Sequence, residues 1–177
     1  MNAVLIYGSV TGKTEYIADQ IVAALEPELE VSIEEVSSLG PDDFPKYDLA
    51  ICGIPTWDIG ELEYGWQDLY DKLDGTDLKN VKVAMFGLGD QRDYADTYQD
   101  AMGLLYLKLL ACGATGGFGF TSVNGHDFEK SKGVINGRFC GLALDEDSQD
   151  DLTEDRIIAW ARQLKGELKL TDSFEAA

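Results

Sequence analysis

The sequence predicts a doubly wound α/β fold, in which helices cover both faces of a parallel sheet. Five short apolar runs recur along the 177 residues, and most are followed by a segment with helical periodicity. Two of these runs, DLAICGIP and VKVAMFGLGD, are apolar without alternation, which is typical of strands that are covered on both faces. Strands and helices that alternate with right-handed crossovers give this architecture.

The predicted elements can be placed in order along the chain. The run AVLIYG gives the first strand, and residues 13–29 give the first helix. The expected buried face of this helix comprises Tyr16, Ile17, Gln20, Ile21, Ala24 and Leu25. EVSIEEV is expected to be a strand near an edge, and a helix that ends at Gly113 follows the fourth run. The last helix, near residues 152–168, is expected to bury Ile157, Ile158, Trp160, Ala161 and Leu164.

The fifth apolar run comes in two pieces, TGGFGF and RFCGLALD, which the polar segment 121–137 separates. A loop of that length inside a compact domain usually has a role of its own. We therefore expect the fifth strand to be split by an insertion at about 121–137. The length of the chain favours a single domain over residues 1–170, with a short C-terminal tail at 171–177.

The net charge is −19, from 14 basic and 33 acidic residues. Such a surface repels phosphate backbones and anionic lipid headgroups, so we expect neither nucleic-acid binding nor membrane insertion. A partner with a basic docking face would be attracted to the acidic segments 58–63 and 145–151. The alternative is that the acidity only provides solubility or reflects a saline habitat.

Cys52, Cys112 and Cys140 lie far apart in apolar runs and indicate buried thiols in a reducing compartment. The single histidine, His126, is expected at the surface.

The acidic run at 145–151 lacks the glycine and glutamate of an EF-hand, so we predict no metal site and interpret the run as an acidic loop with a helix cap. Without a secretory signal pattern or an apolar run of membrane-spanning length, the expectation is a cytoplasmic monomer.

The stretch YGSVTGKT joins the first strand to the first helix. A nucleoside-triphosphate loop needs four residues between its first glycine and the Gly-Lys-Thr, whereas Gly8 and Gly12 are separated by three, so this loop is one residue too short. The hydroxyl groups of Ser9, Thr11 and Thr14, together with the free N–H groups of the helix start, suit a compact terminal phosphate.

Two aromatic residues follow later strands. Trp57, in PTWDIGELEYGW, follows the third strand, and Tyr94, in GLGDQRDYADTYQD, follows the fourth. Both are therefore expected at the carboxyl edge of the sheet, where ligands of open α/β sheets bind. Exposed aromatic rings on opposing loops form a slot for a flat ring.

Taken together, these pieces resemble the long-chain flavodoxins from the first strand through the last helix. The motifs that carry the resemblance are GSVTGKTE, PTWDIGEL, FGLGDQRDYADTYQDA, the split fifth strand and FCGLALDEDSQDDLTEDRI. The resemblance implies a flavodoxin-like, five-stranded parallel sheet in the order 2-1-3-4-5, and FMN as a non-covalently bound cofactor.

The resemblance also implies which residues bind FMN. Ser9, Thr11 and Thr14, with the backbone of Val10, Gly12 and Lys13, would hold the phosphate, and Trp57 and Tyr94 would stack on the two faces of the ring. The remaining residues expected around the ring are Pro55, Thr56, Asp58, Ile59, Gly60, Leu88, Gly89, Asp90, Thr97 and Gln99. In the turn at 58–60, a carbonyl would swing toward flavin N5 after one-electron reduction.

The function implied by the resemblance is that of a low-potential one-electron carrier that substitutes for ferredoxin and has no substrate chemistry of its own. The implied partners are redox proteins such as ferredoxin-NADP reductase, photosystem I, nitrogenase reductase or a pyruvate oxidoreductase. One alternative is an FMN-dependent quinone or NAD(P)H reductase on the same fold, which needs a substrate pocket over the ring. Another is a receiver-like phosphorylation domain, which needs an acidic pair where this chain has YGSVTG.

Overall fold

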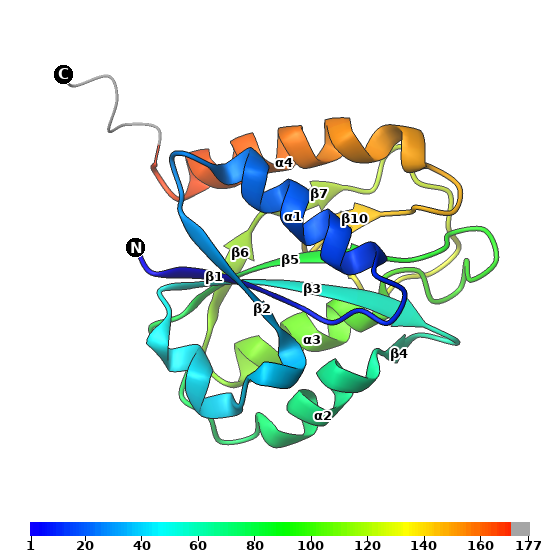
Figure 1. Ribbon diagram of the computed structural model, residues 1–177. Coiled ribbons are helices and arrows are strands. Elements are labelled where there is room, and N and C mark those ends of the chain that lie inside the picture. The colour runs from blue at the N-terminus through cyan, green and yellow to red at the C-terminus, as the bar shows by residue number, and fades with distance from the viewer. Residues whose placement is uncertain (171–177) are drawn as a thin grey trace.

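A parallel sheet lies between two layers of helices in the computed structural model, which describes residues 1–170 (Figure 1). The predicted tail at 171–177 lies outside the described residues. The main sheet contains β1 (Ala3–Tyr7), β2 (Val31–Glu35), β3 (Leu49–Trp57), β5 (Lys82–Leu88), β6 (Thr115–Phe118) and β10 (Leu142–Leu144), and the short β4 (Glu61–Leu62) folds back on β3. The helices α1 (Lys13–Leu25) and α4 (Thr153–Glu167) cover one face, and α2 (Tyr64–Lys72) and α3 (Asp100–Ala111) cover the other.

The strand order confirms the predicted doubly wound topology. Neighbouring strands run β2-β1-β3-β5-β10, all parallel, and β6 also pairs with β5. The strand β5 is thus the fourth of the five parallel positions, and β6 and β10 are the two pieces of the split fifth strand. As expected for EVSIEEV, β2 lies at the edge. The central strands β3 and β5 are buried along most of their length, as their unbroken apolar runs predicted.

Successive residues of each strand point to opposite faces of the sheet, so one strand supplies both cores. On β1, Leu5 packs with the residues under α1 and α4, while Val4 packs with those under α2 and α3. Two tryptophans, Trp160 on α4 and Trp66 on α2, fill the two layers and are almost fully buried. The sheet edge that carries the functional loops is therefore fixed from both sides.

The predicted buried faces of α1 and α4 were wrong at their margins. Tyr16 is 64% exposed and Ile158 is 46% exposed. The buried stripe of α1 instead comprises Thr14, Ile17, Ala18, Ile21, Val22 and Leu25. Tyr16 and Ile158 each lie directly beside a buried residue. The prediction failed there because apolar side chains also occur on the flank of the buried stripe of a helix. The predicted end of α3 is close: Gly113 adopts φ 98° two residues after the helix ends.

The insertion forms a small antiparallel sheet of β7 (Thr121–Ser122), β8 (Val134–Ile135) and β9 (Arg138–Phe139). The expectation that RFCGLALD lies wholly in the main sheet was therefore wrong, because its first two residues form β9. The cause is the turn at Asn136 and Gly137, whose φ angles of 52° and 78° turn β9 back onto β8.

The insertion is anchored to the loop that follows β5. The N–H of Asp127 donates to Gln91 Oε1 at 2.7 Å, and the N–H groups of Glu129 and Lys130 donate to the Ala95 carbonyl at 2.9 and 3.0 Å. The N–H of Lys132 donates to Asp100 Oδ1 at 2.6 Å. The inserted segment therefore supports residues 91–100 from outside.

The expected surface position of His126 was wrong. Its imidazole packs edge-on against Phe139, with ring centroids 5.0 Å apart, and Nδ1 lies 3.2 Å from the Tyr98 hydroxyl. Burial in this cluster, and secondarily the charge of Arg156, lowers the pKa of His126 from 6.5 to about 4. The neighbours that bury it are 28 and 13 positions away in the sequence, so the polar stretch around it gave no sign of them.

Candidate functional site

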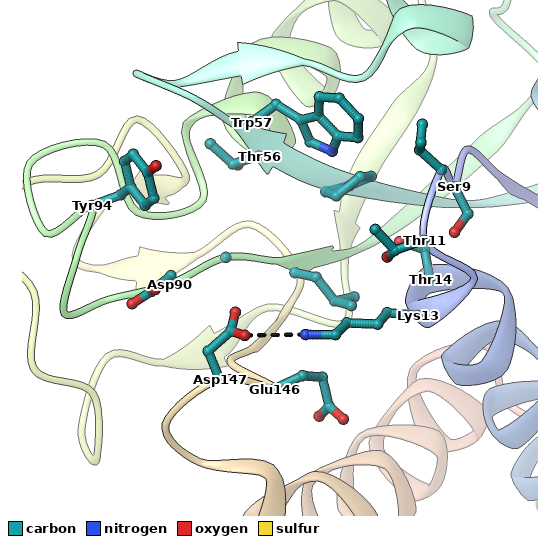
Figure 2. A pocket seen from close by; sticks show the side chains of 14 residues that line it. Ser9, Thr11, Lys13, Thr14, Thr56, Trp57, Asp90, Tyr94, Glu146 and Asp147 are labelled. Atoms are coloured by element: carbon teal, nitrogen blue, oxygen red, sulfur yellow. Dashed lines mark hydrogen bonds and ion pairs between the residues drawn. The ribbon is translucent and has the colours of Figure 1, made fainter.

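A pocket of about 260 Å³ opens at the carboxyl edge of the sheet (Figure 2). Its walls come from the ends of β3 and β5, the start of α1, and the loops after β1, β5 and β10. The lining residues are Ser9, Val10, Thr11, Lys13, Thr14, Pro55, Thr56, Trp57, Leu88, Gly89, Asp90, Tyr94, Glu146 and Asp147.

The loop between β1 and α1, together with the first two residues of α1, forms a polar wall; residues 8–14 are called the hydroxyl loop below. Gly12 precedes the helix with φ 83°, and its N–H donates to Ser9 Oγ at 3.0 Å, which leaves the Ser9 hydroxyl hydrogen free to donate. The N–H groups of the first turn of α1 have no intrahelical acceptor. Hydroxyl and N–H donors thus converge on a space that suits a phosphate group.

The close packing behind the hydroxyl loop requires glycine at position 8. A Cβ there would lie 2.3 Å from Glu63 Oε2 and 2.7 Å from Trp66 Cδ1. Glu63 is 5% exposed and caps α2, because its carboxylate accepts the N–H groups of Gly65 and Trp66 at 3.0 and 3.2 Å. The indole N–H of Trp66 donates to the Gly53 carbonyl at 2.8 Å. The start of α2 therefore fixes the end of β1.

Two aromatic side chains, one at the end of a strand and one in a loop, border the pocket. Trp57 lies at the end of β3, and its ring meets that of Tyr64 edge-on, with centroids 5.6 Å apart and an interplanar angle of 70°. Tyr94 lies in the loop after β5 and is 47% exposed. Figure 2 shows Trp57 at the end of a strand and Tyr94 on a separate loop. This arrangement offers flat apolar surfaces to a planar ligand.

The acidic loop, residues 145–151, follows β10 and completes the pocket. The carboxylate of Asp145 is fully buried; it accepts the N–H groups of Asp147, Ser148 and Gln91 at 3.0, 2.9 and 3.2 Å, and the Ser148 hydroxyl at 2.6 Å. Burial alone raises the pKa of Asp145, but these hydrogen bonds outweigh it and hold the pKa below its usual value. A buried anion thus organises the loop backbone.

The comparisons with known proteins agree on one family. Residues 5–160 match the family model described as flavodoxin. The chain is 46% identical over 161 residues to a flavodoxin of Synechocystis, covering 91% of this chain and 94% of that protein. It is 47% identical over 164 residues to a flavodoxin of Trichodesmium erythraeum, covering 92% and 95%. This chain belongs to the flavodoxin family.

A solved structure shows the same fold. The flavodoxin of Fusobacterium nucleatum, solved with bound flavin mononucleotide, superimposes with a TM-score of 0.87 at 30% identity, over 94% of this chain and 99% of that one. Escherichia coli flavodoxin 2 is 41% identical over 170 residues. The flavodoxin fold therefore extends through the split fifth strand to α4.

Most of the residues predicted for a flavodoxin site line the pocket, but six do not: Gly12, Asp58, Ile59, Gly60, Thr97 and Gln99. Gly12 belongs to the hydroxyl loop, where its N–H donates to Ser9 Oγ. The turn at 58–60 lies beside the pocket, with φ angles of 40° at Asp58 and 83° at Gly60, and Ile59 is 81% exposed. A Cβ at Gly60 would lie 3.3 Å from Thr97 Cβ, so Thr97 supports this turn.

Gln99 supports the pocket from within the core. It is fully buried with φ 61°, and its side-chain N–H₂ donates to the carbonyls of Gly87 and Leu144, both at 3.1 Å. These carbonyls belong to β5 and β10, whose following loops line the pocket. Gln99 therefore holds two strand ends together and does not face the ligand space.

The list of predicted site residues omitted Glu146 and Asp147. The run at 145–151 is interpreted above as an acidic loop with a helix cap, without a role for its individual side chains in the pocket. A usable signal was present: LALDED places these acids directly after a strand, at the same edge as the other loops.

Proposed function

We propose that this pocket holds FMN non-covalently and that the chain transfers single electrons at low potential between redox enzymes. Flavodoxins are FMN-binding electron carriers and not enzymes, and this chain is a member of that family. The observation that supports the proposed site best is the combination, in one pocket, of the hydroxyl groups of Ser9, Thr11 and Thr14 with two aromatic walls.

The residues present fit FMN. Ser9, Thr11 and Thr14 supply hydroxyl donors for the phosphate, and the N–H groups at the start of α1 add to them. Trp57 and Tyr94 supply apolar surfaces for the ring. When bound, FMN supplies the redox chemistry, and the protein orients it and keeps water from its faces.

The charge around the pocket favours a low potential. Asp90, Glu146 and Asp147 line it, against Lys13 as the positively charged lining residue among residues 1–170. Electrons added to a cofactor in this negative field are raised in energy, because like charges repel more strongly at a partly desolvated site than in water. The protein therefore makes a bound flavin a stronger reductant.

The partners we propose are redox proteins with basic docking faces, and the candidates remain ferredoxin-NADP reductase, photosystem I, nitrogenase reductase and a pyruvate oxidoreductase. The net charge of −19 supports this choice. Within residues 1–170, the structure contains no helix that is long and apolar enough to cross a membrane. We propose the cytoplasm as the compartment, because Cys52, Cys112 and Cys140 are all free thiols.

The test is reconstitution of the apoprotein with FMN, FAD and riboflavin, followed by potentiometric titration. We expect tight binding of FMN, weaker binding of riboflavin because it lacks the phosphate, and two separate one-electron steps. Steady oxidation of NAD(P)H by the loaded protein alone, or a preference for FAD, would contradict the proposal.

A further inference from the structure

Lys13 and Asp147 form an ion pair beside the pocket, with Lys13 Nζ 3.0 Å from Asp147 Oδ1 (Figure 2). One residue begins α1 and the other lies in the acidic loop, and both line the pocket. The two side chains are 52% and 55% exposed. An ion pair with this much exposure adds little to stability, so stability alone is a poor explanation for its position.

Asp147 is held in place by the buried part of its own loop. The Asp145 carboxylate accepts the N–H groups of both Asp147 and Ser148, which fixes the backbone on which Asp147 stands. The neighbouring acid, Glu146, is engaged elsewhere, because its carboxylate accepts a hydrogen bond from the Thr153 hydroxyl at the start of α4. Asp147 is thus the acid of this loop that is presented to Lys13.

The hydroxyl loop already offers neutral donors for a phosphate. An unpaired ammonium group at Lys13 would add a positive charge at the first residue of α1, where the helix dipole also favours anions. That charge would strengthen binding of any phosphate, and it would strengthen binding of the more highly charged ones most. The ion pair with Asp147 offsets this charge.

We propose that Asp147 is a specificity-determining residue of this pocket: by holding the Lys13 ammonium in an ion pair, it leaves phosphate recognition to neutral hydroxyl and N–H donors. The pocket then selects a flavin monophosphate through its ring, and it retains free phosphate and polyphosphates poorly. This inference rests on the proposed FMN site and specifies how that site rejects competing anions.

The test uses the apoprotein and calorimetric titration with inorganic phosphate, pyrophosphate, FMN and riboflavin at low and high salt. In the Asp147→Asn protein, Lys13 is released, so we expect affinity for phosphate and pyrophosphate to rise about two- to fivefold at low salt, the range of an exposed ion pair. The gain should shrink as salt is added. Asp147→Glu keeps the charge and should stay near the wild type.

A double-mutant cycle isolates the pair. Lys13→Met should remove the gained phosphate affinity in the Asp147→Asn background and should cost less in the wild-type background. The matched control is Asp68→Asn on α2, which breaks the ion pair between Lys72 and Asp68, with an N–O distance of 2.6 Å and exposures of 58% and 72%. That control should leave phosphate binding unchanged.

The outcomes separate this inference from the proposed function. Unchanged phosphate and pyrophosphate affinity in Asp147→Asn would overturn the inference. An equal loss of FMN and riboflavin binding would also overturn it, because Asp147 would then contact the sugar chain that both ligands share. A wild-type protein that fails to bind FMN would contradict the proposed function instead, and the phosphate titrations can still be read. Circular dichroism confirms that each variant is folded.

Discussion

Gln91 and Asp127 are joined across two separate segments of the chain: the N–H of Asp127 donates to Gln91 Oε1 at 2.7 Å. Gln91 is 2% exposed, and its side-chain N–H₂ donates to Ser148 Oγ at 3.3 Å. Its own N–H donates to Asp145 Oδ2. One buried side chain therefore connects the pocket loop after β5, the insertion and the acidic loop.

Replacing Gln91 with alanine should destabilise the protein by about 1–3 kcal/mol, because it removes the hydrogen bonds that this buried side chain makes with the N–H of Asp127 and with Ser148 Oγ. It should also weaken FMN binding by loosening the loops that line the pocket. Urea unfolding and fluorescence titration measure the two effects. Gln67→Ala is the control, since the side chain of this exposed glutamine, among the described residues, bonds only to Asp71 on its own helix. Equal effects of the two variants would argue against this role of Gln91.

Trp57→Ala and Tyr94→Ala should each weaken FMN binding, through lost ring contact worth about 1 kcal/mol or more. Recovery of flavin fluorescence in the loaded variants gives a second measurement, because stacked aromatic rings quench it. Tyr47→Ala is the control; it precedes β3 at the opposite edge of the sheet. If both pocket variants keep the wild-type affinity, the ring binds elsewhere.

Acidification should destabilise the protein between about pH 6.5 and pH 4 through His126. Its pKa is about 4 in the folded protein and 6.5 without the fold, so in this window the unfolded chain binds more protons and stability falls as pH falls. Burial is the first cause, and the charge of Arg156 adds to it, while Asp145 acts in the opposite direction. The expected loss from this residue is about 1–3 kcal/mol.

The measurement for His126 is urea unfolding at pH 7 and pH 4.5, in the wild type and in His126→Phe. Carboxylates also titrate on acidification, but they do so in both proteins, so the difference in slope isolates the histidine. Phenylalanine preserves contact with Phe139 and removes the titrating group. Parallel pH profiles would show that His126 is protonated as easily in the folded protein as in the unfolded chain.

Electron transfer to a basic-faced reductase should slow as salt is added at constant pH, because the Debye length is about 10 Å at 0.1 M. A rise at low salt can precede the fall if the complex first forms in a wrong orientation.

Neutralising the exposed acids Asp58 and Glu61 should reduce the stopped-flow rate. Glu63, in the same segment, is excluded from docking because it is buried as the cap of α2. Rates that are flat in salt, with no effect of Asp58→Asn and Glu61→Gln, would favour solubility as the role of the acidity.

The sequence predicted the strands and their loops well because those features are local. Each apolar run of a parallel sheet marks its own strand, and the residues that follow it mark the loop at the carboxyl edge. What the sequence could not supply are relations between distant segments. The burial of His126 depends on Tyr98 and Phe139, and the partner of Lys13 lies 134 residues away. The exact margin of a helix stripe, as at Ile158, depends on how that helix rotates against its neighbours.

The insertion and residues 91–100 are coupled by hydrogen bonds, so a change in one segment affects the other. A lineage that deletes residues 121–137 keeps the main sheet, since β5 pairs with both pieces of the fifth strand. The deletion also removes the N–H donors that bond to three acceptors of residues 91–100: Gln91 Oε1, the Ala95 carbonyl and Asp100 Oδ1. A shortened chain would therefore tolerate other residues at positions 91 and 100 better than this one does, because their insertion partners would be absent.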